Sequence, residues 1–141
     1  MKYANIVMAA LLGLIIWPSA LSASETEEAM IGGLLLQLSE SHGACRLNVL
    51  GTNPSSVALD LPAPCAFHRA PSAEIRTVQH ADSIVLLIES SIPLPQSAGD
   101  CDTKLKAVAI ESGNVVVSPH TDQVASCPPF QWDEKVFLGL F

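Results

Sequence analysis

The sequence predicts a small single α+β domain, built mainly on an antiparallel β-sheet of about six to seven short strands. Three observations lead to this fold class. Apolar and polar residues alternate with a period of two along much of residues 45–117, as they do on half-buried strands. Helical spacing is confined to the two ends of the chain, which predicts an N-terminal helix and allows a short C-terminal one. Four cysteines predict two disulfides.

Residues 1–23 have the features of a secretory signal peptide. Lys2 precedes an uncharged apolar run over residues 6–17, and small residues follow up to Ala23, as signal peptidase requires. The apolar run is too short to span a bilayer comfortably. We therefore expect cleavage after Ala23, one domain over residues 24–141, no membrane span in the mature protein, and a periplasmic or secreted location.

All four cysteines lie beyond this segment, and an even number of cysteines in a small exported domain indicates disulfides. Four cysteines allow three pairings. We favour Cys45–Cys65 and Cys101–Cys127, because each pair brackets one strand-turn-strand segment. The competing interpretation is a zinc site, but zinc ligands are usually two to four residues apart, and no two of these cysteines are that close.

The first mature segment, residues 24–43, is predicted to be helical. Ser24 and Glu27 have the spacing of a capping box, and acidic residues follow in the first turn. Gly43 is a suitable C-terminal stop, whereas the glycine pair at 32–33 opposes a helix. The apolar stripe at helical spacing comprises Met30, Ile31, Leu34, Leu35 and Leu38.

The middle of the chain reads as strands joined by turns. The run at 84–88 is continuous in β-branched residues and leucine, so we expect it to be the central strand. Ser112-Gly113-Asn114 has the composition of a hairpin turn. The strand candidates are residues 45–49, 57–61, 65–69, 73–80, 84–88, 105–110 and 115–117.

Two stretches depart from this pattern and supply the candidate interaction residues. Residues 93–100 form a proline-stiffened loop that we expect to be exposed. The tail after Pro128 holds four of the five aromatic side chains of the mature chain, and its apolar residues spaced four apart allow a short helix. The tail either packs onto the sheet, which we favour, or forms an exposed aromatic anchor. The candidate contact residues are Pro93, Leu94, Pro95, Phe130 and Trp132.

Two His-x-Asp pairs are the main candidates for chemistry. His80 and Asp82 form the first pair, and His120 and Asp122 form the second. Residues two apart on a strand share a face, so each pair could ligate a metal or act as an oriented general base. Such short motifs recur by chance, and solvated turns explain both pairs more economically. We therefore assign no metal site, no cofactor and no catalytic residues.

Glu89 borders the most apolar strand candidate. We expect its carboxylate to lie in water at a strand end. If it were buried, it would need a partner. The candidate partners are Arg46, Arg69 and Arg76.

Charge narrows the classes of partner. The formal net charge is −7 at pH 7, and loss of Lys2 with the signal makes the mature chain one charge more negative. This field repels nucleic acid, and no basic run offsets it. The expected function is a small, exported, non-enzymatic binding protein of the inhibitor, immunity or assembly-factor type, whose partner is another extracytoplasmic protein. The alternatives are a metal-binding protein that uses the His-x-Asp pairs and a small hydrolase.

Overall fold

The computed structural model describes residues 26–141, and the predicted signal peptide lies outside the described residues. The described part forms ten strands and one short helix. In chain order these elements are β1 (Glu27–Ile31), β2 (Leu34–Ser41), β3 (Ala44–Leu50), β4 (Ser55–Pro62), β5 (Cys65–Phe67), β6 (Thr77–His80), β7 (Ser83–Pro93), β8 (Asp100–Glu111), β9 (Asn114–Val117), β10 (Asp122–Ser126) and α1 (Glu134–Gly139).

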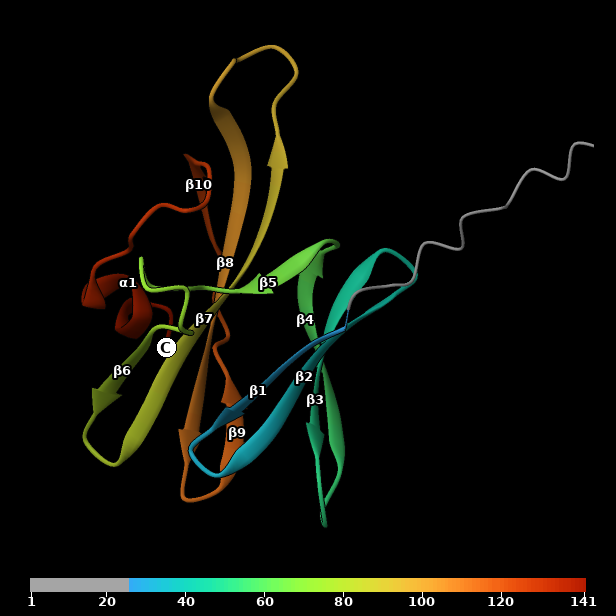
Figure 1. The fold of residues 1–141 in the computed structure, drawn as a ribbon, viewed down its shortest axis with the longest axis vertical. Helices are drawn as coiled ribbons and strands as arrows, with labels where there is room; N and C mark the ends of the chain where they lie inside the picture. Colours follow the sequence, from blue (N-terminus) through green and yellow to red (C-terminus); the bar gives the residue numbers. More distant parts are fainter. Residues whose placement is uncertain (1–25) are drawn as a thin grey trace, which may run out of the picture.

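The strands form two antiparallel sheets rather than one (Figure 1). The four-stranded sheet is a meander with the order β1-β2-β3-β4. The six-stranded sheet has the order β10-β8-β7-β5, with β6 also paired to β7 and β9 also paired to β8. Strand β7 is central, as predicted. The two sheets are consecutive in sequence, so the chain crosses between them once, from β4 to β5.

The predicted N-terminal helix is wrong, because the described part of this segment is the β1–β2 hairpin. Gly32 and Gly33 have φ angles of +57° and +79°, the conformation of a two-residue hairpin turn that glycine adopts without steric cost. Leu36 and Leu38 are buried, and the polar Gln37 lies between them. The apolar residues of this segment fit the spacing of a helix as well as the alternation of a strand. Pairing of β2 with β3 selects the strand. Ser24 lies outside the described residues.

The other predicted strands are present. Two of them, β7 and β8, are longer than predicted, and β10 is an additional strand. Strands β7 and β8 extend well beyond the apolar runs at 84–88 and 105–110, and they pair in register from Ser83↔Glu111 to Pro93↔Cys101. Strand β10 was not predicted, because its sequence contains few large apolar residues. It nevertheless forms by pairing with the edge of β8.

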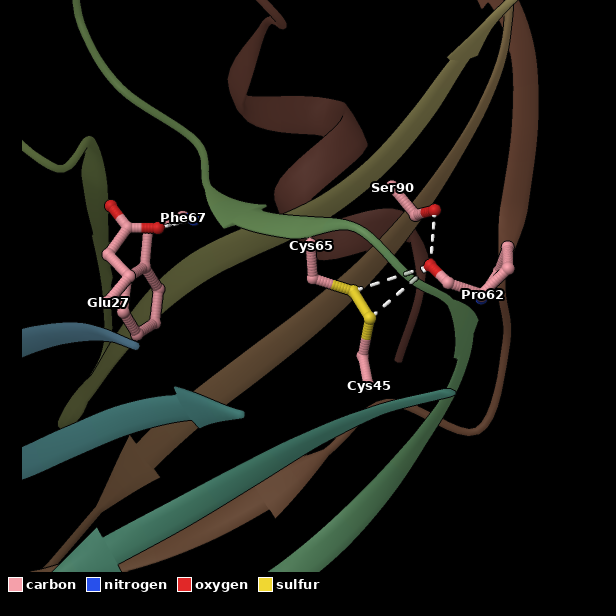
Figure 2. The surroundings of a disulfide bond; sticks show 6 residues. All are labelled: Glu27, Cys45, Pro62, Cys65, Phe67 and Ser90. Atoms are coloured by element: carbon pink, nitrogen blue, oxygen red, sulfur yellow. Dashed lines mark hydrogen bonds between the residues drawn. A yellow bond between two sulfur atoms is a disulfide. The ribbon is translucent and has the colours of Figure 1, made fainter. Parts of the chain in front are cut away.

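The first hydrophobic core fills the space between the two sheets. Alternate residues of β7, Leu86 and Ile88, face this core. The disulfide Cys45–Cys65 joins β3 to β5 and so links the two sheets covalently (Figure 2). The remaining buried members of this core are Ile31, Leu36, Leu38, Leu47, Leu59, Leu61, Phe67, Val108 and Ile110.

The C-terminal tail covers the opposite face of the six-stranded sheet, so the molecule has three layers (Figure 1). Trp132 and Phe137 pack on Leu87 and other residues of that face in a second core. The short C-terminal helix that the sequence allowed is present as α1, and Asp133 caps its start, because the Asp133 side chain accepts hydrogen bonds from the backbone N–H groups of Lys135 and Val136. The tail therefore contributes to the core, as we favoured from the sequence.

No helix in the described part of the chain is long and apolar enough to cross a membrane.

Burial of Phe137 predicts a large effect on stability. We expect Phe137→Ala to lower the free energy of unfolding by about 3–5 kcal/mol, because it removes a fully buried ring and leaves a cavity. Phe141→Ala is the matched control, because this ring is 45% exposed, and we expect a change within about 0.5 kcal/mol. Urea unfolding followed by circular dichroism measures both. Equal losses would contradict the assignment of Phe137 to the second core.

Candidate functional site

The hairpin formed by β7 and β8 projects beyond the rest of the molecule (Figure 1). Its last pair is Pro93↔Cys101, and residues 94–99 form the tip. Only β10 pairs with β8 near this end, so the tip is free on most sides. This loop is the proline-rich segment that the sequence predicted to be exposed, and the structure confirms its exposure.

The tip is held in shape by its own backbone. The Leu94 N–H donates to the Asp100 carbonyl at 3.0 Å, and the Asp100 N–H donates to the Ser97 carbonyl at 3.0 Å. Pro93 and Pro95 restrict φ on the ascending side of the loop. These constraints reduce the number of conformations that the free loop can adopt. The conformational entropy lost when a partner binds is therefore small.

The tip loop is anchored covalently where it joins β8. The predicted disulfide Cys101–Cys127 is present and ties Cys127, just after β10, to Cys101 near the start of β8. Next to it, the Thr103 hydroxyl donates to the Ser126 carbonyl at 2.8 Å, and it lies 2.6 Å from the Ser91 hydroxyl. The end of the hairpin is thus a stiff projection that cannot move independently of β10.

A groove of about 490 Å³ lies between the tip and the anchored segment. Leu94 is 40% exposed on the hairpin side of this groove, and the neighbouring Ile92 is 43% exposed. Asp100 is the one charged side chain in the lining. The other lining residues are small or apolar and include Pro93, Ala98, Cys127 and Pro128. The surface is therefore mainly apolar, with a single negative charge.

The predicted interaction residues divide into two groups. Pro93 and Leu94 line the groove, and Pro95 is exposed on the tip. Phe130 is 48% exposed and packs against Trp132, with ring centroids 4.6 Å apart. Trp132 is itself buried between the tail and the six-stranded sheet, so its ring supports Phe130 and is not accessible to a partner.

Glu89 lies in a buried polar cluster, not in water as expected. It is 8% exposed, and its Oε2 lies 3.4 Å from His68 Nδ1 and accepts a hydrogen bond from Trp132 Nε1 at 3.4 Å. Its partners are therefore a histidine and a tryptophan, and none of the three arginines considered from the sequence. His68 lies just after β5 and 21 residues before Glu89 of β7, so no local pattern could have identified this pair.

A carboxylate next to an imidazole is the arrangement of an oriented general base, but this pair is covered by the tail. His68 is 1% exposed, and its ring lies edge-on against Phe137 with centroids 5.9 Å apart. His68 Nε2 is buried without a hydrogen-bond partner in the described structure. Neither His68 nor Glu89 lines the groove at the hairpin tip. The cluster connects the tail to the sheet and offers no approach for a substrate.

The two His-x-Asp pairs lie at separate places. Asp82 lies in the β6–β7 turn next to His80, while Asp122 begins β10 just after His120. His120 and Asp122 line a depression along α1, whereas His80 lines a different one beside Phe141. Within residues 26–141, no group of three or more His, Cys, Asp or Glu side chains could hold a metal ion.

Comparison with protein-family models, with curated proteins and with solved structures finds no match to this chain.

The buried cluster predicts that Glu89 holds the tail in place. We expect Glu89→Leu to lower the free energy of unfolding by about 1–3 kcal/mol, because it leaves the Trp132 Nε1–H without an acceptor and removes the carboxylate beside the buried His68 ring. Glu89→Gln keeps one acceptor oxygen and should cost less. Urea unfolding measures both variants, and Trp132 fluorescence reports the tail directly. A Leu variant as stable as the native protein would refute this role.

The disulfides predict different effects on the hairpin. Replacing both Cys101 and Cys127 by serine should cost about 2–5 kcal/mol and should speed amide hydrogen exchange at Ser97, because the base of the tip is released. The matched control replaces Cys45 and Cys65, which join the two sheets elsewhere. We expect that control to lose stability with unchanged exchange at the tip under native conditions. Equal exchange at the tip in both variants would show that the anchor does not stiffen it.

Proposed function

We propose that this protein is an exported, non-enzymatic binding protein that contacts another extracytoplasmic protein through the tip of the β7–β8 hairpin. The observation that carries the proposal is the exposure of Ile92 and Leu94 on a projecting, hydrogen-bonded and disulfide-anchored loop. Exposed apolar side chains on a rigid projection favour binding, because they are desolvated on contact and little order has to be gained.

The distribution of exposed apolar residues supports this choice of surface. Five other large apolar side chains are exposed in the described part of the chain, namely Met30, Val57, Val116, Phe130 and Phe141. They are widely spaced along the chain, and single exposed apolar residues are normal on any protein. At the tip, Ile92 and Leu94 are two residues apart and both exposed, and Leu94 also lines a groove. This concentration distinguishes the hairpin from the rest of the described surface.

The proposal includes an extracytoplasmic location for the protein. Two disulfides in a small domain are compatible with an oxidising extracytoplasmic compartment, and the features of residues 1–23 favour export. A preorganised loop of this kind suits an inhibitor, an immunity protein or an assembly factor, because all three must recognise one surface of one partner. Neither a metal-binding function nor a hydrolase gains a supporting observation from the two separated His-x-Asp pairs or from the covered His68–Glu89 pair.

The experiment is a pull-down with the immobilised mature protein from its own extracytoplasmic fraction, with partners identified by mass spectrometry. We expect Leu94→Asp to weaken capture by roughly thirty-fold, because it places a charge at the centre of the contact. Val116→Asp is the matched control, because Val116 is 41% exposed on β9, at the other end of the six-stranded sheet. It should capture the same partner at the native level.

The same pair of variants can overturn the proposal. If both variants capture the partner equally well, or if both lose it together while folded, the hairpin tip is not the binding surface. Circular dichroism of each variant establishes that the fold is retained.

A further inference from the structure

Strand β1 forms one free edge of the four-stranded sheet. Among the described strands it pairs with β2 alone, and the two-residue turn at Gly32-Gly33 makes Ile31 and Leu34 a directly opposed pair. In such a hairpin the residues that flank the turn bond to each other, and hydrogen-bonded pairs then alternate along the strand. The backbone N–H and C=O groups of Glu28 and Met30 therefore point away from β2, toward the free edge.

The neighbouring edge of β5 has its outward backbone N–H satisfied by a side chain, unlike the edge of β1 at Glu28 and Met30. Phe67 in β5 directs its backbone N–H away from β7, and the Glu27 side chain accepts this hydrogen bond at 3.0 Å (Figure 2). Glu27 also pairs with Arg69. The Glu27 carboxylate thus accepts the outward N–H of β5 and also pairs with the Arg69 guanidinium. The outward backbone groups of Glu28 and Met30 lie next to Glu27 along β1.

A groove of about 490 Å³ runs beside this edge, between β1 and the segment that leads into β6. Ile75 and Ile84 line it and also pack against the core between the sheets. Met30 lies on its rim and is 67% exposed. An added strand would therefore find backbone partners on one side and an apolar surface beneath its alternate side chains.

The charge of the groove selects the kind of strand. Glu28 and Glu74 line it, whereas the one cation there, Arg69, is engaged by Glu27 and by the Ala73 carbonyl. With a net charge of −7 on the whole chain, a second copy of this protein is repelled. A basic segment is attracted instead, because lysine or arginine side chains would face the carboxylates of Glu28 and Glu74, neither of which pairs with a cation in the described part of the chain. Glu28 accepts only a neutral hydrogen bond, from the Gln37 amide at 2.7 Å.

We propose that the β1 edge is a second binding surface, which takes an extended basic segment of a partner protein as a fifth strand of the four-stranded sheet. The backbone of Glu28 and Met30 supplies the pairing, Ile75 and Ile84 receive the apolar side chains, and Glu28 and Glu74 receive the basic ones. This surface is distinct from the hairpin tip, and each can fail without the other.

The test uses the whole mature protein, labelled with ¹⁵N, and a synthetic capped hexapeptide that alternates valine and lysine. We expect the peptide to shift the amide signals of Glu28 and Met30 and to slow their exchange with solvent. A matched peptide that alternates valine and glutamate should bind at least roughly five-fold more weakly. Equal effects of the two peptides, or shifts at another strand edge in place of β1, would overturn the proposal.

Two proline variants test whether the peptide binds at the edge of β1. Met30→Pro removes an outward N–H, a change that an edge strand tolerates, and it should abolish the effect of the valine–lysine peptide. Val115→Pro is the control, because Val115 has the corresponding outward position on β9, after the turn at Ser112-Gly113. It should leave the effect unchanged. Retained binding by a folded Met30→Pro protein would refute strand addition.

If Met30→Pro does not fold, Glu28→Lys gives an independent answer. It keeps the backbone and inverts one charge, so the valine–lysine peptide should bind roughly five-fold more weakly and the valine–glutamate peptide more tightly. An unchanged preference would show that the carboxylates of the groove do not select the strand.

Discussion

Strand β7 must be covered on both faces, and most of the architecture follows from this constraint. Its apolar run directs Leu86 and Ile88 toward one side and Val85 and Leu87 toward the other. A strand that is apolar on both faces is stable only between two layers. The four-stranded sheet supplies one layer, and the C-terminal tail supplies the other. The tail is therefore part of the fold, although its helix α1 is too short to be stable alone.

The chain crosses from one sheet to the other over a few residues, and several contacts meet there. The carbonyl of Pro62 accepts a hydrogen bond from the Ser90 hydroxyl at 2.5 Å, which ties the crossing to β7 (Figure 2). Cys65 follows at once and is bound to Cys45 in the four-stranded sheet. The covalent link and the buried hydrogen bond hold the two layers together where the chain passes between them.

The buried polar cluster is separate from both surfaces proposed to bind. Glu89, His68 and Trp132 lie between the tail and the six-stranded sheet, where Glu89 accepts a hydrogen bond from Trp132 inside an apolar layer. The hairpin tip lies outside both cores, so its sequence can vary at little cost in stability. The edge of β1 differs, because Ile75 and Ile84 of its groove also pack against the first core.

Local patterns in the sequence determined a good part of this structure. The period of two located most strands, Ser112-Gly113 marked a hairpin turn, and apolar residues spaced four apart indicated the short terminal helix. The bracketing of one strand-turn-strand segment by each pair of cysteines predicted both disulfides. These features depend on residues close together in the chain, or on turn chemistry that acts over a few residues, so they can be read without knowing the fold.

Only the tertiary structure decided the rest. The apolar residues of 27–41 fit a helix or a strand, and the presence of β3 as a partner selected the hairpin. The division of the strands into two sheets, the burial of Glu89 beside His68 and the pairing of β10 with β8 depend on which distant segments pack together. A single sequence records the period of each segment but not its neighbour, because packing and hydrogen-bond satisfaction are properties of the assembled chain.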